Sequence, residues 1–325
     1  MILNLKIILI IALLLLIGFF FIPLPKAGHP VWGVNFSQKQ AEMLSLDWKK
    51  TYLAILDDLK VRNIKLPAHW DLIEPQEGSF DFNDLDWQIK EAGERNAKIL
   101  LVLGIKTTRW PECHIPDWAK NLSKEKQQER ILEMIQIVIN RYKNSDAISS
   151  WQVENEPFLS FGDCPWQDEN FLRKEVSLVK QIDSARPIII SASGEWSSWL
   201  KEAELADKVA ITMYRIAWFP EYNRYLDYYF PQMFYWIKSE IVNIMRGKNV
   251  IVGELQAEPW GKTLLSDSSL EEQIKTMNLD QFKENIAFAE GTGFNEFYLW
   301  GSEWWYWMKE KQNKPDIWLQ AQNLF

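Results

Sequence analysis

The sequence contains few cysteine and histidine residues, which limits the metal and disulfide chemistry that it can support. Only two Cys and three His occur among 325 residues, and no His, Cys and Asp side chains lie at the spacing of a metal-ligand cluster. This argues against a catalytic zinc site, and we expect neither a metal nor a cofactor. Cys113 and Cys164 fall in expected loops, where they are either joined as a disulfide or remain two free thiols.

An excess of positive charge is also lacking. Lys and Arg number 36 against 44 Asp and Glu, a formal net charge of -8, and no basic cluster is interleaved with aromatic residues. A nucleic-acid partner is therefore not expected. No internal repeat, low-complexity tract or Pro/Gly/Ser-rich linker interrupts the chain from Val31 to Phe325. We expect one large domain there, and the oligomeric state is not indicated.

One long apolar run is present near the N-terminus. Residues 7–22 carry no charge, follow Lys6 and precede two prolines. The run is slightly short for a membrane span of about 20 residues, yet no convincing signal-cleavage site follows it. We therefore expect residues 1–27 to form a hydrophobic helix that anchors the protein in a membrane, with cleavage and secretion as the alternative. Residues 28–325 would then form an extracytoplasmic catalytic domain.

Short apolar or β-branched runs alternate with longer amphipathic stretches from Val31 onward, which is typical of βα units and a parallel sheet. We expect eight strands, at Val31–Asn35, Asn63–Leu66, Lys98–Leu103, Ser149–Val153, Pro187–Ser191, Lys208–Tyr214, Asn249–Glu254 and Glu296–Trp300. Helices are expected at Leu46–Leu59, Asn83–Arg95, Lys124–Tyr142, Glu169–Ile182 and Leu270–Ala289. This order predicts an α/β fold, a (β/α)8 TIM barrel preceded by one hydrophobic helix.

Carboxylates end two of the expected strands. The fourth run leads into Asn155-Glu156-Pro157 and the seventh ends in Glu254. In a (β/α)8 barrel the loops at the carboxyl ends of the strands form the active face, and strands four and seven lie roughly across it from one another. Cleavage of a glycosidic bond requires two carboxyl groups on either side of the bond. The pattern therefore predicts a glycoside hydrolase site.

Two further features make the chain resemble the clan A glycoside hydrolases. The Asn-Glu-Pro motif after strand four and the glutamate after strand seven are similar to the two catalytic motifs of that clan. A loop after strand two resembles the W-x-x-I-E-P-x-x-G-x-F/Y-x-F segment of clan A xylanases and β-galactosidases; it reads Trp70-Asp71-Leu72-Ile73-Glu74-Pro75-Gln76-Glu77-Gly78-Ser79-Phe80-Asp81-Phe82. The resemblance covers the chain from about Trp32 to Trp305.

The resemblance implies a role for several residues. Glu156 would be the general acid/base and Glu254 the nucleophile that forms a covalent glycosyl-enzyme intermediate. Asn155 would bond the 2-hydroxyl of the substrate. Tyr214, at the end of run six, resembles the tyrosine that positions the nucleophile, and Trp300, ending run eight, resembles the platform beneath the sugar that is cleaved.

The sequence departs from several clan members at strand two. Lys65 stands where these families carry an arginine, so a point charge replaces a bidentate fork. Lys65 can still hold Glu254 ionised, but the exchange argues against the cellulase-like family five. The third run, which leads into Gly104 and later Trp110, is closer to the β-galactosidase and family thirty-nine pattern. The family within the clan stays open.

Other residues on the expected active face are candidates for sugar binding. The chain has 18 Trp, and an indole face can stack on a sugar ring as well as pack a core. We expect His69, Trp70 and Trp110 to line the cleft. Glu303, near Trp300, would contact substrate hydroxyls or remain a solvated loop carboxylate.

Two further glutamates need an assignment. Glu258 is the alternative to Glu254 as nucleophile. Glu154 lies one strand period from Glu156 and would face the barrel interior with it, although a structural role is expected for it.

The expected activity is hydrolysis of β-glycosidic bonds in an oligo- or polysaccharide with retention of configuration. Two alternatives remain: transglycosylation through the same intermediate, and a non-catalytic carbohydrate-binding barrel displayed at a membrane. The presence of both carboxylates argues against the second. The sequence does not indicate the glycan, the linkage or whether cleavage is internal or terminal.

Overall fold

The computed structural model describes residues 24–25 and 28–325. The apolar run at residues 7–22 lies outside the described residues, so the predicted hydrophobic helix and the division at residue 27 stay predictions. Within the described part of the chain, no helix is both long enough and apolar enough to cross a membrane.

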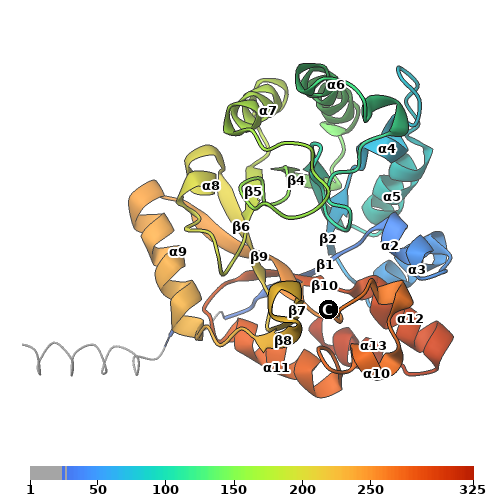
Figure 1. The fold of residues 1–325 in the computed structure, drawn as a ribbon, viewed down its shortest axis with the longest axis vertical. Coiled ribbons are helices and arrows are strands. Elements are labelled where there is room, and N and C mark those ends of the chain that lie inside the picture. Colours follow the sequence, from blue (N-terminus) through green and yellow to red (C-terminus); the bar gives the residue numbers. More distant parts are fainter. Residues whose placement is uncertain (1–23, 26–27) are drawn as a thin grey trace, which may run out of the picture.

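Eight parallel strands close into a barrel at the centre of the molecule, in the order β1-β10-β9-β6-β5-β4-β3-β2 (Figure 1). Closure leaves no strand with an unpaired edge, and the outer face of the sheet is covered by helices. The predicted (β/α)8 barrel is confirmed. Its strands are β1 (Val31–Asn35), β2 (Asn63–Pro67), β3 (Lys98–Leu103), β4 (Ile148–Val153), β5 (Ile188–Ala192), β6 (Lys208–Met213), β9 (Asn249–Gln256) and β10 (Glu296–Trp300).

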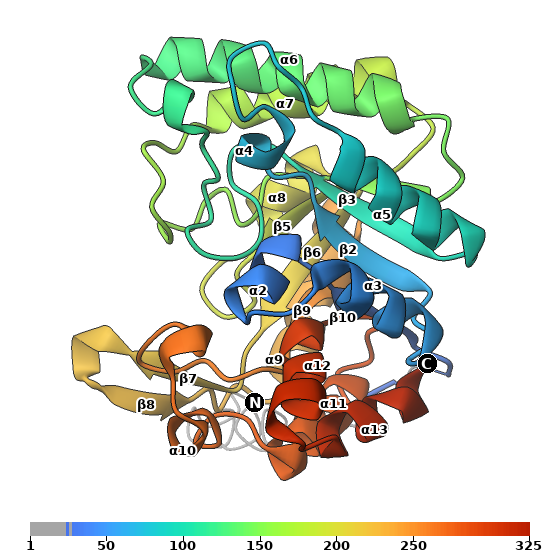
Figure 2. The same cartoon turned by 90° about the vertical axis from the view of Figure 1, so that its right-hand side faces the viewer.

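Helices surround the barrel, and the long pair α6 and α7 pack side by side over one flank in both views (Figures 1 and 2). The α-helices are α2 (Gln38–Met43), α3 (Trp48–Asp57), α4 (Trp70–Ile73), α5 (Asn83–Glu94), α6 (Lys124–Tyr142), α7 (Glu169–Ile182), α8 (Leu200–Leu205), α9 (Gln232–Arg246), α10 (Leu270–Gln273), α11 (Leu279–Glu290), α12 (Ser302–Gln312) and α13 (Asp316–Ala321). Short 3-10 turns are η1 (Asp117–Ala119), η2 (Pro220–Tyr222), η3 (Leu265–Asp267) and η4 (Gln322–Leu324).

Alternation along the strands divides the apolar side chains between two cores. On β3, Leu100 and Val102 belong to a small cluster inside the barrel, with members from β5, β6, β9 and β10. Leu101 and Leu103, one residue away, join the larger cluster between the barrel and its helices. The barrel is therefore filled largely by apolar side chains below its mouth, and the polar groups of the candidate site lie at the carboxyl ends of the strands.

The single helix predicted at Leu270–Ala289 is wrong, because the segment forms α10 and α11 with a break between them. The side chain of Asn278 accepts a hydrogen bond from the Gln281 backbone and so caps the start of α11. Thr276 uses its hydroxyl to accept a hydrogen bond from the backbone of Trp260. Both polar side chains favour a helix boundary over a helix interior.

Strand β6 is not followed directly by a helix, contrary to the simple βα alternation. An antiparallel hairpin, β7 (Ile216–Phe219) and β8 (Arg224–Asp227), follows it before α9. Figure 2 shows this hairpin projecting from the barrel. The side chain of Gln256 on β9 bonds the backbone of Ile216 in both directions, which attaches the base of the hairpin to the sheet.

Candidate active site

Glu254 lies at an irregularity in β9. Ile251 belongs to the apolar cluster inside the barrel, so strict alternation would turn Gly253 inward and Glu254 outward. The register of β9 shifts by one residue at this point against both β6 and β10. Such a bulge re-aims the side chains that follow it. The bulge therefore returns the Glu254 carboxylate to the mouth of the barrel.

Two donors hold the Glu254 carboxylate. Lys65 on β2 is fully buried, and its Nζ donates to Glu254 Oε1 at 2.8 Å. The hydroxyl of Tyr214 donates to Glu254 Oε2 at 3.3 Å. Burial, aided by the charges of Glu254 and Glu156, holds the pKa of Tyr214 well above its usual value, so the hydroxyl keeps its proton. An ammonium and a hydroxyl favour the charged carboxylate, as a nucleophile requires.

We expect the Lys65–Glu254 pair to be strongly coupled in stability. Replacing Lys65 by Met leaves a buried carboxylate without its cation, which costs about 3–5 kcal/mol of unfolding free energy. The double variant Lys65→Met/Glu254→Gln should recover most of that loss, because it removes both charges. Denaturant unfolding of the two single variants, the double variant and the parent measures the coupling. The coupling would be contradicted if Lys65→Met lowered the unfolding free energy equally in the parent and in the Glu254→Gln variant.

Glu156 occupies a different environment from Glu254. Strand β4 ends at Val153, and both Glu154 and Glu156 take positive φ values, 59° and 44°. The Glu156 backbone N–H donates to Ser191 Oγ at 2.7 Å. Burial, followed by the negative charges of Glu254 and Glu112, holds the pKa of Glu156 well above its usual value. A carboxyl group that keeps its proton at neutral pH can act as a general acid.

The Asn155 side chain is buried and held in one orientation. Its Oδ1 accepts from Ser191 Oγ at 3.0 Å and from Gln152 Nε2 at 3.2 Å. Its Nδ2 donates to Glu112 Oε2 at 3.2 Å. Because an acceptor is bonded only to donors and a donor to an acceptor, the amide cannot flip without losing these bonds.

Glu156, Glu254, Tyr214 and Trp300 line one cleft of about 330 Å³. The guanidinium of Arg109 lies 4.0 Å from the centre of the Trp300 ring and covers one of its faces. Aromatic side chains form much of the remaining wall: Phe161, Trp196, Trp218, Phe219, Tyr228 and Trp260. The cleft thus combines two carboxyl groups with several flat apolar surfaces, as carbohydrate sites do.

Two residues predicted to line the cleft lie elsewhere. Trp70 is fully buried: its Nε1 donates to Glu74 Oε2 at 2.8 Å, and its ring packs edge-on against Trp118. His69 is buried, with its ring centre 3.9 Å from that of His114, and burial holds the pKa of His69 well below the usual value. His69 faces a separate cavity under α4. The residues directly after β2 therefore serve packing.

Trp110 and Glu303 also differ from the prediction. Trp110 is 44% exposed and packs edge-on against the wall residue Phe161, but it does not itself line the cleft. Glu303 is completely buried, where it accepts hydrogen bonds from the Ser37 backbone at 2.6 Å and from Arg109 at 3.0 Å. It is neither a solvated loop carboxylate nor a wall of the cleft. Its role is to fix Arg109.

Glu258, the alternative nucleophile, is also paired with Arg109. Its side chain is buried and lies outside the cleft that holds Glu156 and Glu254. The charge of the guanidinium is thus shared between two structural carboxylates. This geometry leaves Glu254 as the carboxylate of β9 that faces the barrel mouth.

The two cysteines form a disulfide, Cys113–Cys164, which resolves the alternative left open by the sequence. The bond joins the loop after β3 to the loop after β4. These loops carry Glu112 and Glu156 respectively. The bond therefore fastens together two loops that form part of the cleft.

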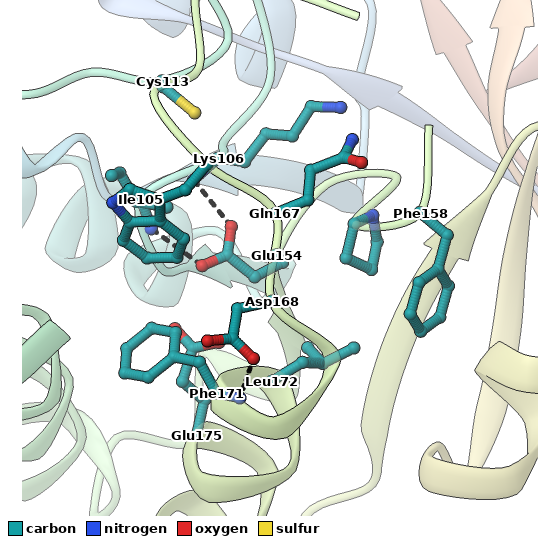
Figure 3. Close-up of a pocket in the computed structure, with 12 residues that line it drawn as sticks. Ile105, Lys106, Cys113, Glu154, Phe158, Gln167, Asp168, Phe171, Leu172 and Glu175 are labelled. Carbon is teal, nitrogen blue, oxygen red and sulfur yellow. Dashed lines mark hydrogen bonds between the residues drawn. The ribbon is translucent and has the colours of Figure 1, made fainter. Parts of the chain in front are cut away.

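Glu154 does not face the barrel interior with Glu156, because regular alternation ends with β4 at Val153. Figure 3 shows its carboxylate turned toward the loop after β3, where it accepts hydrogen bonds from the backbone N–H groups of Ile105 at 2.9 Å and Lys106 at 2.6 Å. Gly104 makes room for it, since a Cβ there would lie 2.4 Å from Glu154 Oε1. Glu154 has a structural position.

Glu175 on α7 shares a cavity of about 30 Å³ with Glu154 (Figure 3). Among the described residues no N–H or hydroxyl donor reaches either carboxyl oxygen of Glu175, and the group that it meets is the Glu154 carboxyl. Burial and the neighbouring charge of Glu154 hold the pKa of Glu175 well above its usual value, while burial raises the pKa of Glu154 to about 7. Two adjacent buried carboxyl groups of this kind retain a proton near neutral pH.

The pair predicts a pH-dependent gain in stability for Glu175→Gln. The folded-state pKa of Glu175 is raised, so its contribution to stability is complete below the unfolded pKa and is lost as the pH rises. The unfolding free energy of Glu175→Gln minus that of the parent should therefore increase between about pH 4 and about pH 8. Denaturant unfolding across this range tests it, with Glu284→Gln, at an exposed position on α11, as the control. A difference independent of pH would refute the shared proton.

Sequence reasoning missed three cleft carboxyl groups, Glu112, Glu195 and Glu221. The first two follow barrel strands, β3 and β5, so the rule that the active face lies beyond the strand ends gave a signal for them. Glu195 accepts a hydrogen bond from the Tyr235 hydroxyl at 2.7 Å, and burial raises its pKa to about 7. Nowhere in the described ranges do three or more His, Cys, Asp or Glu side chains come together as a metal ion would need.

Comparison with known proteins agrees with this geometry. The family model described as glycosyl hydrolase family 10 matches residues 49–176, less than half of the chain but including Asn155 and Glu156. The β-galactosidase BgaA of Clostridium cellulovorans is 27% identical over 175 residues, which are 47% of this chain and 26% of that protein. The chain thus spans about a quarter of the length of this curated relative.

Solved structures share the fold. Native xylanase 10B of Thermotoga maritima has a TM-score of 0.60 at 14% identity, with 91% of this chain and 95% of that chain covered. A GH10 endoxylanase from a sugarcane soil metagenome has a TM-score of 0.59 at 14% identity, with coverages of 91% and 98%. The exo-β-1,4-mannosidase Op5Man5 of an Opitutaceae bacterium has a TM-score of 0.54 at 14% identity, with coverages of 85% and 53%. The predicted resemblance to the clan A glycoside hydrolases is confirmed.

Proposed function

We propose that this protein is a retaining glycoside hydrolase that cleaves β-glycosidic bonds in an oligo- or polysaccharide. One observation carries the proposal: two carboxyl groups line a single aromatic cleft in opposite electrostatic surroundings. Glu254 is bonded to an ammonium and a hydroxyl. Glu156 is buried beside negative charges that keep it protonated. This is the division that a nucleophile and a general acid require.

The chemistry follows from this division. In the first step the Glu254 carboxylate attacks the anomeric carbon while Glu156 gives its proton to the departing glycosidic oxygen. Glu254 has no negative charge in the resulting glycosyl-enzyme ester. Glu156, which has given away its proton, can now act as a base. In the second step Glu156 takes a proton from water, which attacks the anomeric carbon and releases Glu254. Two inversions give overall retention.

The walls of the cleft support a carbohydrate substrate. Trp260 packs against Tyr214, the donor to Glu254, with ring centres 4.9 Å apart. Trp196 is 62% exposed and lines a pocket together with Glu156. Aromatic faces at both carboxyl groups can hold sugar rings on either side of the scissile bond. The similar proteins named above are a xylanase, a β-galactosidase and a β-mannosidase, so β-linked glycans are the class to test first.

The test is hydrolysis of a panel of aryl β-glycosides and β-linked polysaccharides by the full chain, with the first product analysed by proton NMR. We expect the β anomer to appear first and to mutarotate later. Sugar products longer than the substrate would indicate transglycosylation. Binding of glycans without any turnover would instead support a non-catalytic barrel, and an α anomer as first product would refute retention.

We also propose that the catalytic domain is extracytoplasmic and anchored through residues 7–22. The apolar run and the disulfide support this, because disulfides persist in oxidising compartments. Fractionation of cells that express the full chain should recover it with membranes, and a chain that begins at residue 28 should not be. Recovery of a shortened protein from the medium would favour cleavage and secretion.

A further inference from the structure

The cleft contains a third carboxyl group that the proposed mechanism does not use. Glu112 is 5% exposed and lines the cleft with Glu156 and Glu254. Asn155 donates to its Oε2 at 3.2 Å, and no other side chain of the described residues donates to it. Double displacement needs only two carboxyl groups. The remaining oxygen of Glu112 is therefore available to a molecule in the cleft.

The loop after β3 is built to hold Glu112 in this position. Glu112 adopts a left-handed φ of 72°, its N–H donates to the Arg109 carbonyl at 2.7 Å, and its carbonyl accepts from Thr107 at 2.8 Å. Gly162 allows the side chain to pass, since a Cβ there would lie 2.5 Å from the Glu112 Cβ. The next residue, Cys113, is tied by the disulfide. A costly backbone conformation fixed from several sides is typical of functional residues.

No Lys, Arg or His nitrogen of the described residues lies within 4.0 Å of the Glu112 carboxylate, so Lys65 and Lys106 act on it only from a distance. Lys65 is bound to Glu254 at 2.8 Å. Lys106, in the same loop, donates to the carbonyl oxygens of Glu156 at 3.1 Å and Leu159 at 2.8 Å. Burial and the negative charge of Glu254 consequently raise the pKa of Glu112 to about 8.

The lining of the whole cleft has the same character. It includes five glutamates and no Lys, Arg or His: Glu112, Glu156, Glu195, Glu221 and Glu254. Such a lining offers an anion no cationic partner, whereas its carboxyl groups can pair with a cation, and the low dielectric of the cleft strengthens such a pair. A glycan with uronic acid groups is thus disfavoured. A glycan with a positive group would supply the counter-ion that Glu112 lacks.

We propose that Glu112 binds a protonated amino group of the sugar, so that the substrate is a β-linked glycan containing an unacetylated amino sugar. The inference rests on the proposed glycosidase function and names the substrate class of the same site. An ammonium group pairs with the carboxylate and donates hydrogen bonds to it. An acetamido group has no charge and fills more space. A hydroxyl group donates a hydrogen bond but carries no positive charge to offset that of the buried Glu112 carboxylate.

The first test compares kcat/KM for three tetrasaccharides of matched linkage, made of β-1,4-linked glucosamine, N-acetylglucosamine or glucose. We expect about a tenfold to hundredfold preference for glucosamine, the size of a charge-assisted hydrogen bond. Glu112→Gln should remove this preference while glucose-tetramer hydrolysis changes by less than the preference lost. Glu112→Asp, which keeps the charge, should retain part of it. Glu284→Gln, which removes a carboxylate at an exposed position on α11 outside the cleft, should leave the preference intact.

A second test detects the proton that Glu112 loses when it meets an ammonium group. Titration calorimetry with a sulfur-linked glucosamine disaccharide, repeated in buffers of different ionisation enthalpy near pH 6, should show proton release, because Glu112 is protonated in the free cleft and the amine already carries its charge. The release should vanish in Glu112→Gln, whose folding is checked by its thermal transition.

The outcomes separate this inference from the function on which it rests. Failure to hydrolyse any β-glycan would refute the glycosidase function itself. The role of Glu112 would be overturned if the glucose or N-acetylglucosamine tetramer had a kcat/KM equal to that of the glucosamine tetramer and binding released no proton. The glycosidase function would be unaffected by that result.

Discussion

We expect Glu254→Ala to lose nearly all hydrolysis of β-glycosides, by roughly ten-thousandfold to a millionfold in kcat, as when a nucleophile is removed from an intact site. The alanine leaves space at the anomeric carbon. Added azide should enter that space and restore turnover of an activated aryl glycoside. A single displacement by azide inverts the configuration, so the product should be an α-glycosyl azide. Product NMR measures both the rescue and its stereochemistry.

The matched control for this variant is Glu258→Ala. Glu258 lies four residues later, is also buried, and is paired with Arg109 outside the cleft. Its replacement by alanine should lower the unfolding temperature and leave kcat within a few fold of the parent, with no response to azide. Azide rescue of a Glu258 variant instead of Glu254→Ala would move the nucleophile to Glu258.

The second large effect is expected for Glu156→Ala and depends on the leaving group. Loss of a general acid costs about a hundredfold to ten-thousandfold when the departing oxygen needs a proton. A dinitrophenolate needs none, so its release in the first step should be nearly unaffected, and the second step becomes rate-limiting. Azide then accelerates that step, and because it completes a double displacement the product is a β-glycosyl azide. A uniform loss for good and poor leaving groups would contradict the role.

The pH profile gives an independent check of Glu156. The group is needed in its protonated form, so kcat/KM falls as the pH rises through its pKa, which burial and neighbouring charges hold well above the usual value. This alkaline limb should be absent in Glu156→Gln. Glu154→Gln, two residues earlier but directed at the loop after β3, should keep the limb. Its presence in Glu156→Gln would assign the limb to another group.

The barrel itself could be predicted from the sequence because its strands have a simple physical signature. Buried parallel strands are short runs of β-branched and apolar residues, and all eight expected runs correspond to barrel strands with bounds that differ by at most two residues. The two carboxylates were found for the same reason, since a polar residue at the end of an apolar run is easily recognised.

The orientation of individual side chains was harder to predict. A strict period of two places Glu254 outside the barrel, and only the bulge at Gly253 turns it inward. The same period left open that Glu154 faces the barrel interior with Glu156, because it does not account for the left-handed backbone after Val153. The structural role expected for Glu154 agrees with its place in the structure. Both features depend on backbone pairing with neighbouring strands, which a single sequence does not display.

Burial also separated the tryptophans in a way that sequence position did not. Trp70 follows the end of β2 and Trp300 is the last residue of β10, yet Trp70 is enclosed by Glu74 and Trp118 while Trp300 lines the cleft. Glu112 was overlooked because it lies in an irregular loop nine residues after β3, where no period applies. Its position depends on contacts with the loop after β4, which is distant in the sequence.

The β7–β8 hairpin allows the substrate preference of the protein to evolve separately from its reaction. Its aromatic residues Trp218 and Phe219 line the cleft, but Glu156 and Glu254 belong to the barrel. The hairpin is joined to the barrel through Gln256 and through the backbone of Trp260. Mutation, insertion or exchange of this one segment can therefore change which glycan fits the cleft. Glu156 and Glu254 keep their relative positions, so new specificities can evolve by replacement of the hairpin alone.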